Sequence, residues 1–274
     1  MLKQRLLTAA LLIPLVVASI LLLSTAIFQG VLAIIVLLAA WEWFSIIGFK
    51  QNNQKLFSLL VFSLIIVLTS LLPTSSLLLL TVLIWLAVLI FIGVFAHKPL
   101  PAVALKLFME KNTALMMSAV VLSLFWHGAV ELHSSSSLGP QQLLYVMVLV
   151  WLADTGGYFA GKRWGKIPLA KAISPNKTWE GVGGALVLGT VWALIGFVLN
   201  FSGEISLFNW ITLSVFALFI SIIGDLFESL FKRCYQVKDS GNLLPGHGGM
   251  LDRIDSLIAA VPVFTAAIYF LGAS

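Results

Sequence analysis

The sequence predicts an all-α, polytopic integral membrane protein with about nine transmembrane helices. Hydrophobic residues make up 60% of its 274 positions, and the mean hydropathy is +1.07. Apolar runs of about 20 residues, the length that a helix needs to cross a hydrocarbon core, recur from one end of the chain to the other. Because backbone groups in lipid must be hydrogen-bonded internally, runs this long favour helices over barrel strands.

The predicted spans follow one another with short connections. They comprise residues 6–24, 29–49, 56–72, 77–96, 113–131, 142–160, 179–200, 208–230 and 250–272. The sequence contains no internal repeat and no long linker, so we expect a single membrane domain over residues 1–274. Residues 1–140 supply mainly hydrophobic spans. Residues 141–274 carry both long polar connections and form the expected catalytic half.

The distribution of basic residues predicts the topology. With nine spans, all 16 Lys and Arg residues fall on the side of the N-terminus. The positive-inside rule then places the N-terminus in the cytoplasm and the C-terminus outside. The net charge of +5 follows from this bias and requires no nucleic-acid partner. Basic cytoplasmic loops also suit anionic lipid head groups and phosphorylated substrates.

The two longest inner connections, 153–184 and 224–256, concentrate the polar chemistry. The second holds five acidic residues, four basic residues and a histidine, in a chain that is only 10% charged. Ionisable groups next to a bilayer are costly, so where they persist they usually line a polar site. We therefore expect the chemistry of the protein in this segment.

Two pairs of acids in this segment have helical spacing. Asp252 and Asp255 are three residues apart, as are Asp225 and Glu228, so each pair can share one face of a helix. Together they would make an oxygen-rich site for a hard cation such as Mg2+. The alternative is that the acids pair with the neighbouring bases, and for Arg253 we expect such a pair. The bases are Lys232, Arg233, Lys238 and Arg253.

A glycine-rich turn precedes the last acidic pair. Its sequence is Pro245-Gly246-His247-Gly248-Gly249. Glycine lets a backbone approach a ligand closely, and the start of the next helix would offer free N–H groups to an anion. Acids for a metal, together with glycines and lysines for phosphate, favour metal-assisted phosphoryl or nucleotidyl transfer.

Residues 229–255 read SLFKRCYQVKDSGNLLPGHGGMLDRID, which closely resembles the signature of phosphatidate cytidylyltransferases, also called CDP-diacylglycerol synthases. The first connection is similar to the same family, through Asp154, Tyr158 and Gly161 and the run SPNKTWEG at 174–181. The resemblance covers roughly the last 130 residues, and the rest of the chain matches mainly as hydrophobic spans.

The resemblance implies transfer of CMP from CTP to phosphatidic acid, giving CDP-diacylglycerol and pyrophosphate for phospholipid biosynthesis. It implies Mg2+, with a second cation site of unknown identity, and CTP, phosphatidic acid and membrane lipids as partners. It also implies a homodimer in the inner membrane of a bacterium, with the active site facing the cytoplasm.

Residue roles follow for both connections. The expected metal ligands are Asp225, Asp252 and Asp255, with Asp154 and Glu228 as secondary candidates. The expected catalytic residues are Asp225, Lys238, Asp239, His247, Asp252, Arg253 and Asp255. The expected substrate-binding residues are Ser174, Lys177, Thr178, Lys232, Arg233, Gly246, Gly248 and Gly249.

Several of these residues have a second interpretation. Asp239 could instead form a local turn, Lys232 and Arg233 could simply end a span, and Lys177 could lie in a solvated loop. Glu42, in the second span, either sits at the wet interface or reaches the site. Gly157, Gly161 and Gly165 are four residues apart, which favours close helix packing.

Two other functions remain alternatives to nucleotidyl transfer. A cation-coupled transporter should show two related halves with broken helices, whereas here the polar residues gather at one end of the chain. A CDP-alcohol phosphatidyltransferase also uses aspartates and Mg2+. Its motif, D-G-x-x-A-R followed by G-x-x-x-D-x-x-x-D, does not occur in this sequence.

Overall fold

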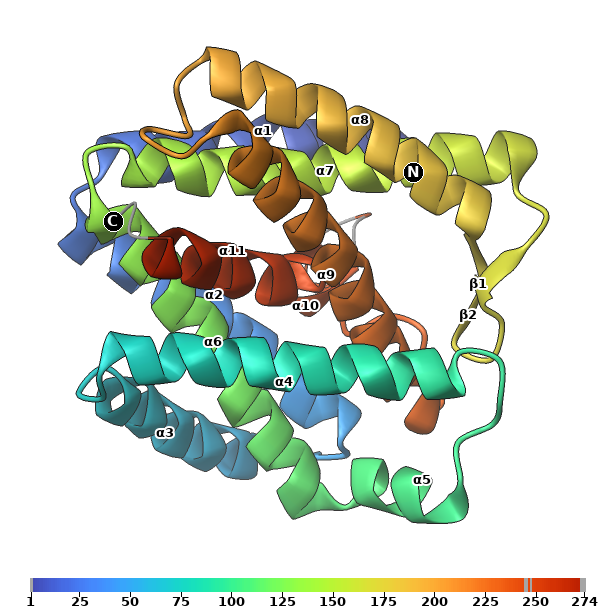
Figure 1. The fold of residues 1–274 in the computed structure, drawn as a ribbon. Coiled ribbons are helices and arrows are strands. Elements are labelled where there is room, and N and C mark those ends of the chain that lie inside the picture. The colour runs from blue at the N-terminus through green and yellow to red at the C-terminus, as the bar shows by residue number, and fades with distance from the viewer. Residues whose placement is uncertain (1, 244–245, 247, 272–274) are drawn as a thin grey trace.

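The computed structural model describes residues 2–243, 246 and 248–271. They form a helical bundle with one short hairpin (Figure 1). The elements are α1 (Leu2–Leu22), α2 (Thr25–Ile46), α3 (Asn52–Thr69), α4 (Thr74–Phe95), α5 (Ala102–Met109), α6 (Lys111–Ser135), α7 (Gly139–Trp164), β1 (Pro168–Ala170), β2 (Ser174–Thr178), α8 (Trp179–Val198), α9 (Leu207–Cys234), α10 (Leu251–Ile254) and α11 (Leu257–Phe270).

The predicted all-α membrane fold is confirmed. Within the described residues, 8 helical segments are long and apolar enough to cross a bilayer, and the last of them is Leu251–Phe270. Each predicted span coincides with a helix. In α1 only Ala10–Leu22 counts as an apolar helix, which is shorter than a span. A ninth crossing by α1 and the sides of the two termini therefore stay predictions.

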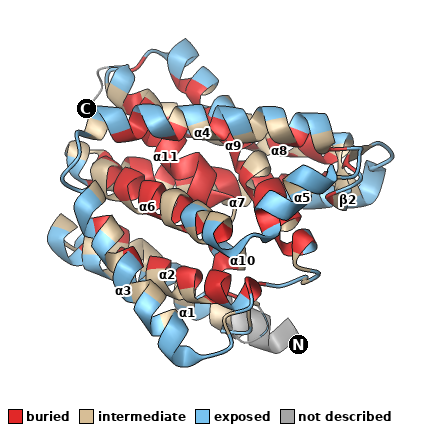
Figure 2. Cartoon of the chain, turned by 90° about the horizontal axis from the view of Figure 1, so that it is seen from below, coloured by how far each residue is buried: buried red, intermediate tan, exposed pale blue. Residues whose placement is uncertain are grey.

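Helix α11 forms the centre of the bundle and packs on α4, α6, α7 and α9. Nearly all of its residues are buried, as the red helix in Figure 2 shows. Its one polar side chain before Tyr269, Thr265, donates to the carbonyls of Gly128 and Val261, both at 2.9 Å. Gly128 allows α6 to approach α11 closely, because a Cβ at this position would lie 2.6 Å from Pro262.

Helices α7 and α8 make the most extensive helix contact in the chain. A Cβ on Gly156 would lie 2.5 Å from the carbonyl oxygen of Gly184, so these two glycines bring the backbones together. Gly161 approaches Thr178 in the same way, at 3.3 Å. The predicted close packing is confirmed, although Gly157 itself has ordinary contact at 3.7 Å.

Two elements near the polar end were not predicted. Helix α5 connects α4 to α6, and the hydroxyl of Tyr235 donates to its Phe108 carbonyl at 3.0 Å. The antiparallel hairpin β1–β2 pairs Pro168 with Thr178 and Ala170 with Ser174. In Figure 1 the hairpin and α5 lie at the same end of the bundle, as the alternating topology requires.

The turn between α5 and α6 shows how a polar residue fixes a helix start. Glu110 caps α6, and its carboxylate accepts from the backbone N–H groups of Asn112 and Thr113. The hydroxyl of Thr113 donates to the same carboxylate and is the first cause of the lowered pKa of Glu110, followed by the two backbone bonds. A charged cap here also suits the helix dipole.

Candidate active site

A cavity of about 730 Å³ lies between α7, the hairpin, the start of α8 and α9. Four glycines line it, so helix backbone forms much of its wall. The polar side chains that line it are Asp154, Tyr158, Lys162, Asn176, Lys177, Thr178 and Asp225. The volume is in the usual range for a small-molecule site, and a mainly apolar wall with a few polar groups is typical of one.

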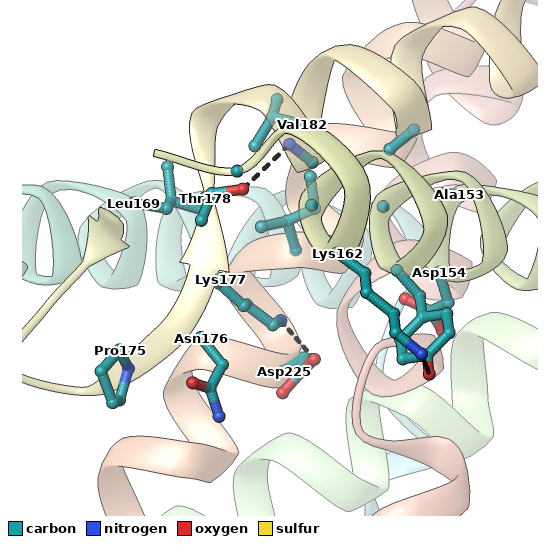
Figure 3. A pocket seen from close by; sticks show the side chains of 17 residues that line it. Ala153, Asp154, Lys162, Leu169, Pro175, Asn176, Lys177, Thr178, Val182 and Asp225 are labelled. Carbon is teal, nitrogen blue, oxygen red and sulfur yellow. Dashed lines mark hydrogen bonds and ion pairs between the residues drawn. The ribbon is translucent and has the colours of Figure 1, made fainter. Parts of the chain in front are cut away.

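Lys177 and Asp225 form an ion pair in this cavity. Lys177 lies on β2 and Asp225 on α9, and Figure 3 shows the two side chains pointing towards each other. Both remain partly open, with 28% and 23% of their side-chain surface exposed. Asp225 also accepts from the hydroxyl of Ser229 at 3.2 Å. The structure therefore brings the first polar connection against the second.

The hairpin and a helix cap hold Lys177 in place. Thr178, the next residue, caps α8 by accepting from the N–H of Gly181 at 3.2 Å. The N–H of Trp179 donates to the carbonyl of Ile167 at 3.0 Å. Thr178 lines the cavity, whereas Ser174 starts β2 and is not among the lining residues. Lys177 is thus on a fixed element rather than in a solvated loop.

Two acidic residues line the cavity, and two more interact with them electrostatically. Asp154 on α7 lines the same cavity as Asp225. Asp255, in the turn between α10 and α11, lies within electrostatic range of Asp154, Asp225 and Glu228. The carboxylate of Asp255 accepts from the N–H of Ser256 at 2.6 Å. Neighbouring ionised carboxylates repel one another, and a bound cation would relieve this repulsion.

The chemistry of these side chains fits a hard cation. All four offer carboxylate oxygens, the ligands that Mg2+ prefers. Glu228 is fully buried, and its Oε1 accepts no hydrogen bond from the described residues. Its Oε2 contacts the Lys232 ammonium at 2.6 Å, which is an ion pair without hydrogen-bond geometry. Among the residues described, no three potential ligands are already close enough to hold one ion.

Asp252 has a different environment from Asp255. Its Oδ1 accepts from the Lys232 ammonium at 2.7 Å, and its Oδ2 accepts from the N–H groups of Ser240 and Gly249, both at 2.9 Å. The two aspartates are one helical turn apart, since Asp255 directly follows the end of α10 at Ile254 and keeps helical backbone angles (φ −50°, ψ −48°), but their carboxylates have different partners. Asp252 joins the two ends of the segment 240–251, the glycine loop, whereas Asp255 interacts electrostatically with the other carboxylates.

Lys232 is buried and bridges two acids. Its ammonium contacts Glu228 at 2.6 Å and Asp252 at 2.7 Å. The interpretation in which the bases pair with neighbouring acids is therefore confirmed for Lys232. For Arg253 the expected ion pair is wrong: its side chain is exposed and, of the described acids, acts at longer range on Asp154.

The glycine loop is shaped by backbone conformation and close packing. Gly246 and Gly248 have φ of 77° and 80°, which glycine adopts most readily. We expected the backbone N–H groups at the start of the following helix to be free for an anion. This expectation is wrong for three residues, whose N–H groups already donate to carboxylates. Gly249 donates to Asp252, and Met250 and Leu251 donate to Glu42. His247 and Pro245 lie outside the described residues.

Comparison with known proteins gives the family. A sequence model of the Cytidylyltransferase family matches residues 3–271. The chain belongs to the cytidylyltransferase family. This match includes the N-terminal spans, which the motif resemblance alone did not cover.

Three relatives show how far the similarity extends. The phosphatidate cytidylyltransferase of Pseudomonas aeruginosa is 37% identical over 272 residues, which cover 99% of this chain and 98% of that protein. The protein of the same name from Haemophilus influenzae is 37% identical over 289 residues, with 99% and 100% covered. The one from Bacillus subtilis is 40% identical over 158 residues, with 57% and 56% covered.

Three other predicted site residues are exposed and lie outside the cavity. Arg233, Lys238 and Asp239 are exposed, and Arg233 Nη1 donates to the carbonyl of Val237 at 3.4 Å. They do not line the cavity around Lys177. Their expected contact with substrate stays a prediction.

Glu42 is the residue whose role the sequence left open. It is an acid in an otherwise apolar span, between Trp41 and Trp43. The structure buries it to 5% exposure and joins its carboxylate to the glycine loop. The interpretation as a wet interfacial side chain is wrong, because loop donors surround the carboxylate.

Proposed function

We propose that this protein transfers CMP from CTP to phosphatidic acid, releasing pyrophosphate and forming CDP-diacylglycerol for phospholipid biosynthesis. Full-length similarity to two bacterial phosphatidate cytidylyltransferases supports this function. The observation that carries it is the ion pair of Lys177 and Asp225 inside a cavity at the polar end of a membrane bundle. A lysine suits a phosphate, and a carboxylate suits the cation that accompanies a nucleotide.

The reaction needs little acid–base chemistry. An oxygen of the lipid phosphate attacks the α-phosphorus of CTP, and the bond from that phosphorus to the β-phosphate oxygen breaks. The attacking oxygen is already anionic, so no proton must be removed. The protein then acts mainly by positioning the reactants and neutralising their charge. Lys177 serves this role by exchanging its contact with Asp225 for a phosphate oxygen.

We infer that Asp225 and Asp255 hold Mg2+, with Asp154 and Glu228 nearby to complete one or two cation sites. When bound, the cation neutralises the phosphates and the departing pyrophosphate. Release of Lys177 to the substrate would free an oxygen of Asp225 for this ligand role. Asp252 fits the metal less well, because loop donors and Lys232 already occupy both of its oxygens.

The proposed setting is the inner membrane of a bacterium, with the cavity open to the cytoplasm, where CTP is found, and the protein acting as a homodimer. The bias of all 16 basic residues towards one predicted side supports this orientation. The cavity lies beside the hairpin, at the end of the bundle that this bias assigns to the cytoplasm.

An assay on the purified protein in detergent tests the function. CTP and phosphatidic acid should together give pyrophosphate and CDP-diacylglycerol in equal amounts, whereas CTP alone should give neither. A CDP-alcohol phosphatidyltransferase would instead consume CDP-diacylglycerol and release CMP. Absence of pyrophosphate across a range of Mg2+ and lipid concentrations, from protein shown to be folded, would overturn the proposal.

A further inference from the structure

The carboxylate of Glu42 connects the N-terminal half of the chain to the glycine loop. Oε2 accepts from the hydroxyl of Ser240 at 2.8 Å and from the N–H of Leu251 at 2.9 Å. Oε1 accepts from the N–H of Met250 at 3.0 Å. These partners lie at both ends of the loop, so one side chain on α2 draws the two ends together.

Close packing shows that the loop is fitted to this side chain. A Cβ on Gly241 would lie 2.6 Å from Glu42 Oε1, and its three nearest neighbours would all be atoms of Glu42. A Cβ on Gly249 would collide with Glu42 and with Ser240. Gly241 does not have a positive φ. Its lack of a side chain is therefore explained by the approach of Glu42 and not by backbone conformation.

The loop that Glu42 holds leads directly into Asp252 and Asp255, the two aspartates of the polar site. Asp252 accepts from the N–H groups of Ser240 and Gly249, next to the residues that Glu42 holds. Asp252 also fixes the ammonium of Lys232. One turn further along the chain is Asp255, which interacts electrostatically with Asp225 and Asp154. A shift of the loop would therefore move Asp255 relative to the cavity.

Glu42 itself stays outside the cavity around Lys177, so it can act on the reaction only through the loop. We propose that Glu42 is a positioning residue for nucleotidyl transfer, which sets the glycine loop and, through it, the placement of Asp255. This inference rests on the proposed function. Residues that orient a functional group from behind commonly change activity by about 10- to 100-fold when they are replaced.

Glu42→Gln is the direct test. The amide keeps one acceptor oxygen but turns an NH2 group towards loop donors, so at least one of the three bonds is lost. We expect kcat per folded molecule to fall about 10- to 100-fold, with a smaller change in the KM for CTP. Amide hydrogen exchange at Met250 and Leu251 should accelerate. Glu131→Gln, the same change on the predicted outer side, is the matched control and should leave kcat unchanged.

Ser240→Ala provides a second route that makes a smaller change to the fold. It removes the hydroxyl that donates to Glu42 and keeps the backbone N–H that donates to Asp252. We expect a several-fold fall in kcat, and no further fall when Ser240→Ala is added to Glu42→Gln, because both act on one contact.

The outcomes separate this inference from the proposed function. An inactive wild-type protein would overturn the function itself. With an active wild type, unchanged kcat in Glu42→Gln would overturn the positioning role. So would a loss of folded protein with normal kcat in the folded fraction, or fully additive losses in the double variant.

Discussion

Lys177 on β2 and Asp225 on α9 are joined by an ion pair inside the cavity between α7, the hairpin, α8 and α9. The pair links the two polar connections of the chain and places a cation and an anion at the same point of the site. In the proposed reaction each partner changes contact, the lysine to a phosphate and the aspartate to Mg2+. The first two predictions test these two side chains separately.

Replacement of Lys177 should impair use of CTP. Lys177→Ala removes a charge-assisted donor, worth roughly 1.5–3 kcal/mol, so kcat/KM for CTP should fall about 10- to 100-fold. Lys177→Arg should recover only part of the activity, because a planar fork replaces a compact ammonium. Lys98→Ala removes an exposed charge on the same predicted side and is the control. Equal, small effects of Lys177→Ala and Lys98→Ala would assign the first connection a structural role only.

Asp225→Asn and Asp255→Asn should abolish turnover without unfolding the protein. Each removes a proposed Mg2+ ligand, so kcat should fall by at least about 100-fold, and the Mg2+ concentration for half-maximal rate should rise. Rates measured across a Mg2+ series, together with thermal unfolding in detergent, check both points. Activity that depends normally on Mg2+ in Asp255→Asn would remove this residue from the cation site.

Asp252→Asn should behave differently from Asp255→Asn. Asp252 holds Lys232 and the N–H groups of Ser240 and Gly249, so its replacement weakens the loop as well as the site. We expect a lower thermal midpoint in addition to lost activity, whereas Asp255→Asn should keep the midpoint of the wild type. Identical midpoints for the two variants would mean that Asp252 is not a structural anchor.

Lys232 should be more important for stability than its position at a helix end suggests. Lys232→Met leaves Glu228 and Asp252 buried without their cation, and breaking a buried pair costs about 3–5 kcal/mol. The double variant Lys232→Met with Glu228→Gln removes one of the stranded charges and should regain part of this loss. Denaturant unfolding of the three proteins in mild detergent measures it. A double variant less stable than Lys232→Met alone would contradict the ion-pair account.

The sequence predicts the spans well because each apolar run specifies its own helix. Residues of the two predicted polar connections do meet at one cavity. Contacts between distant segments could not be predicted in the same way. Glu42 meets Met250 and Leu251 across 208 and 209 residues, and no local pattern encodes that pairing. The sequence indicated a special role for Glu42 only because it is an acid in an apolar span. The different partners of Asp252 and Asp255 depend on tertiary packing and could not be predicted from their helical spacing.

Labelling of single cysteines tests the predicted topology from Asn53 to the C-terminus. In a Cys234→Ser background, cysteines at Ser137 and Ser274 should react with an impermeant reagent added outside the cell. Cysteines at Asn53 and Lys166 should react only after the membrane is opened. The expectation follows from nine crossings, which put the two termini on opposite sides, and from the basic residues, which gather on the N-terminal side. If Ser274 and Lys166 are both labelled only in opened cells, the number of crossings between them is even. One of the helices α8, α9 and α11 then fails to cross the membrane. The cytoplasmic position of the cavity would in that case depend on the labelling result at Lys166 alone.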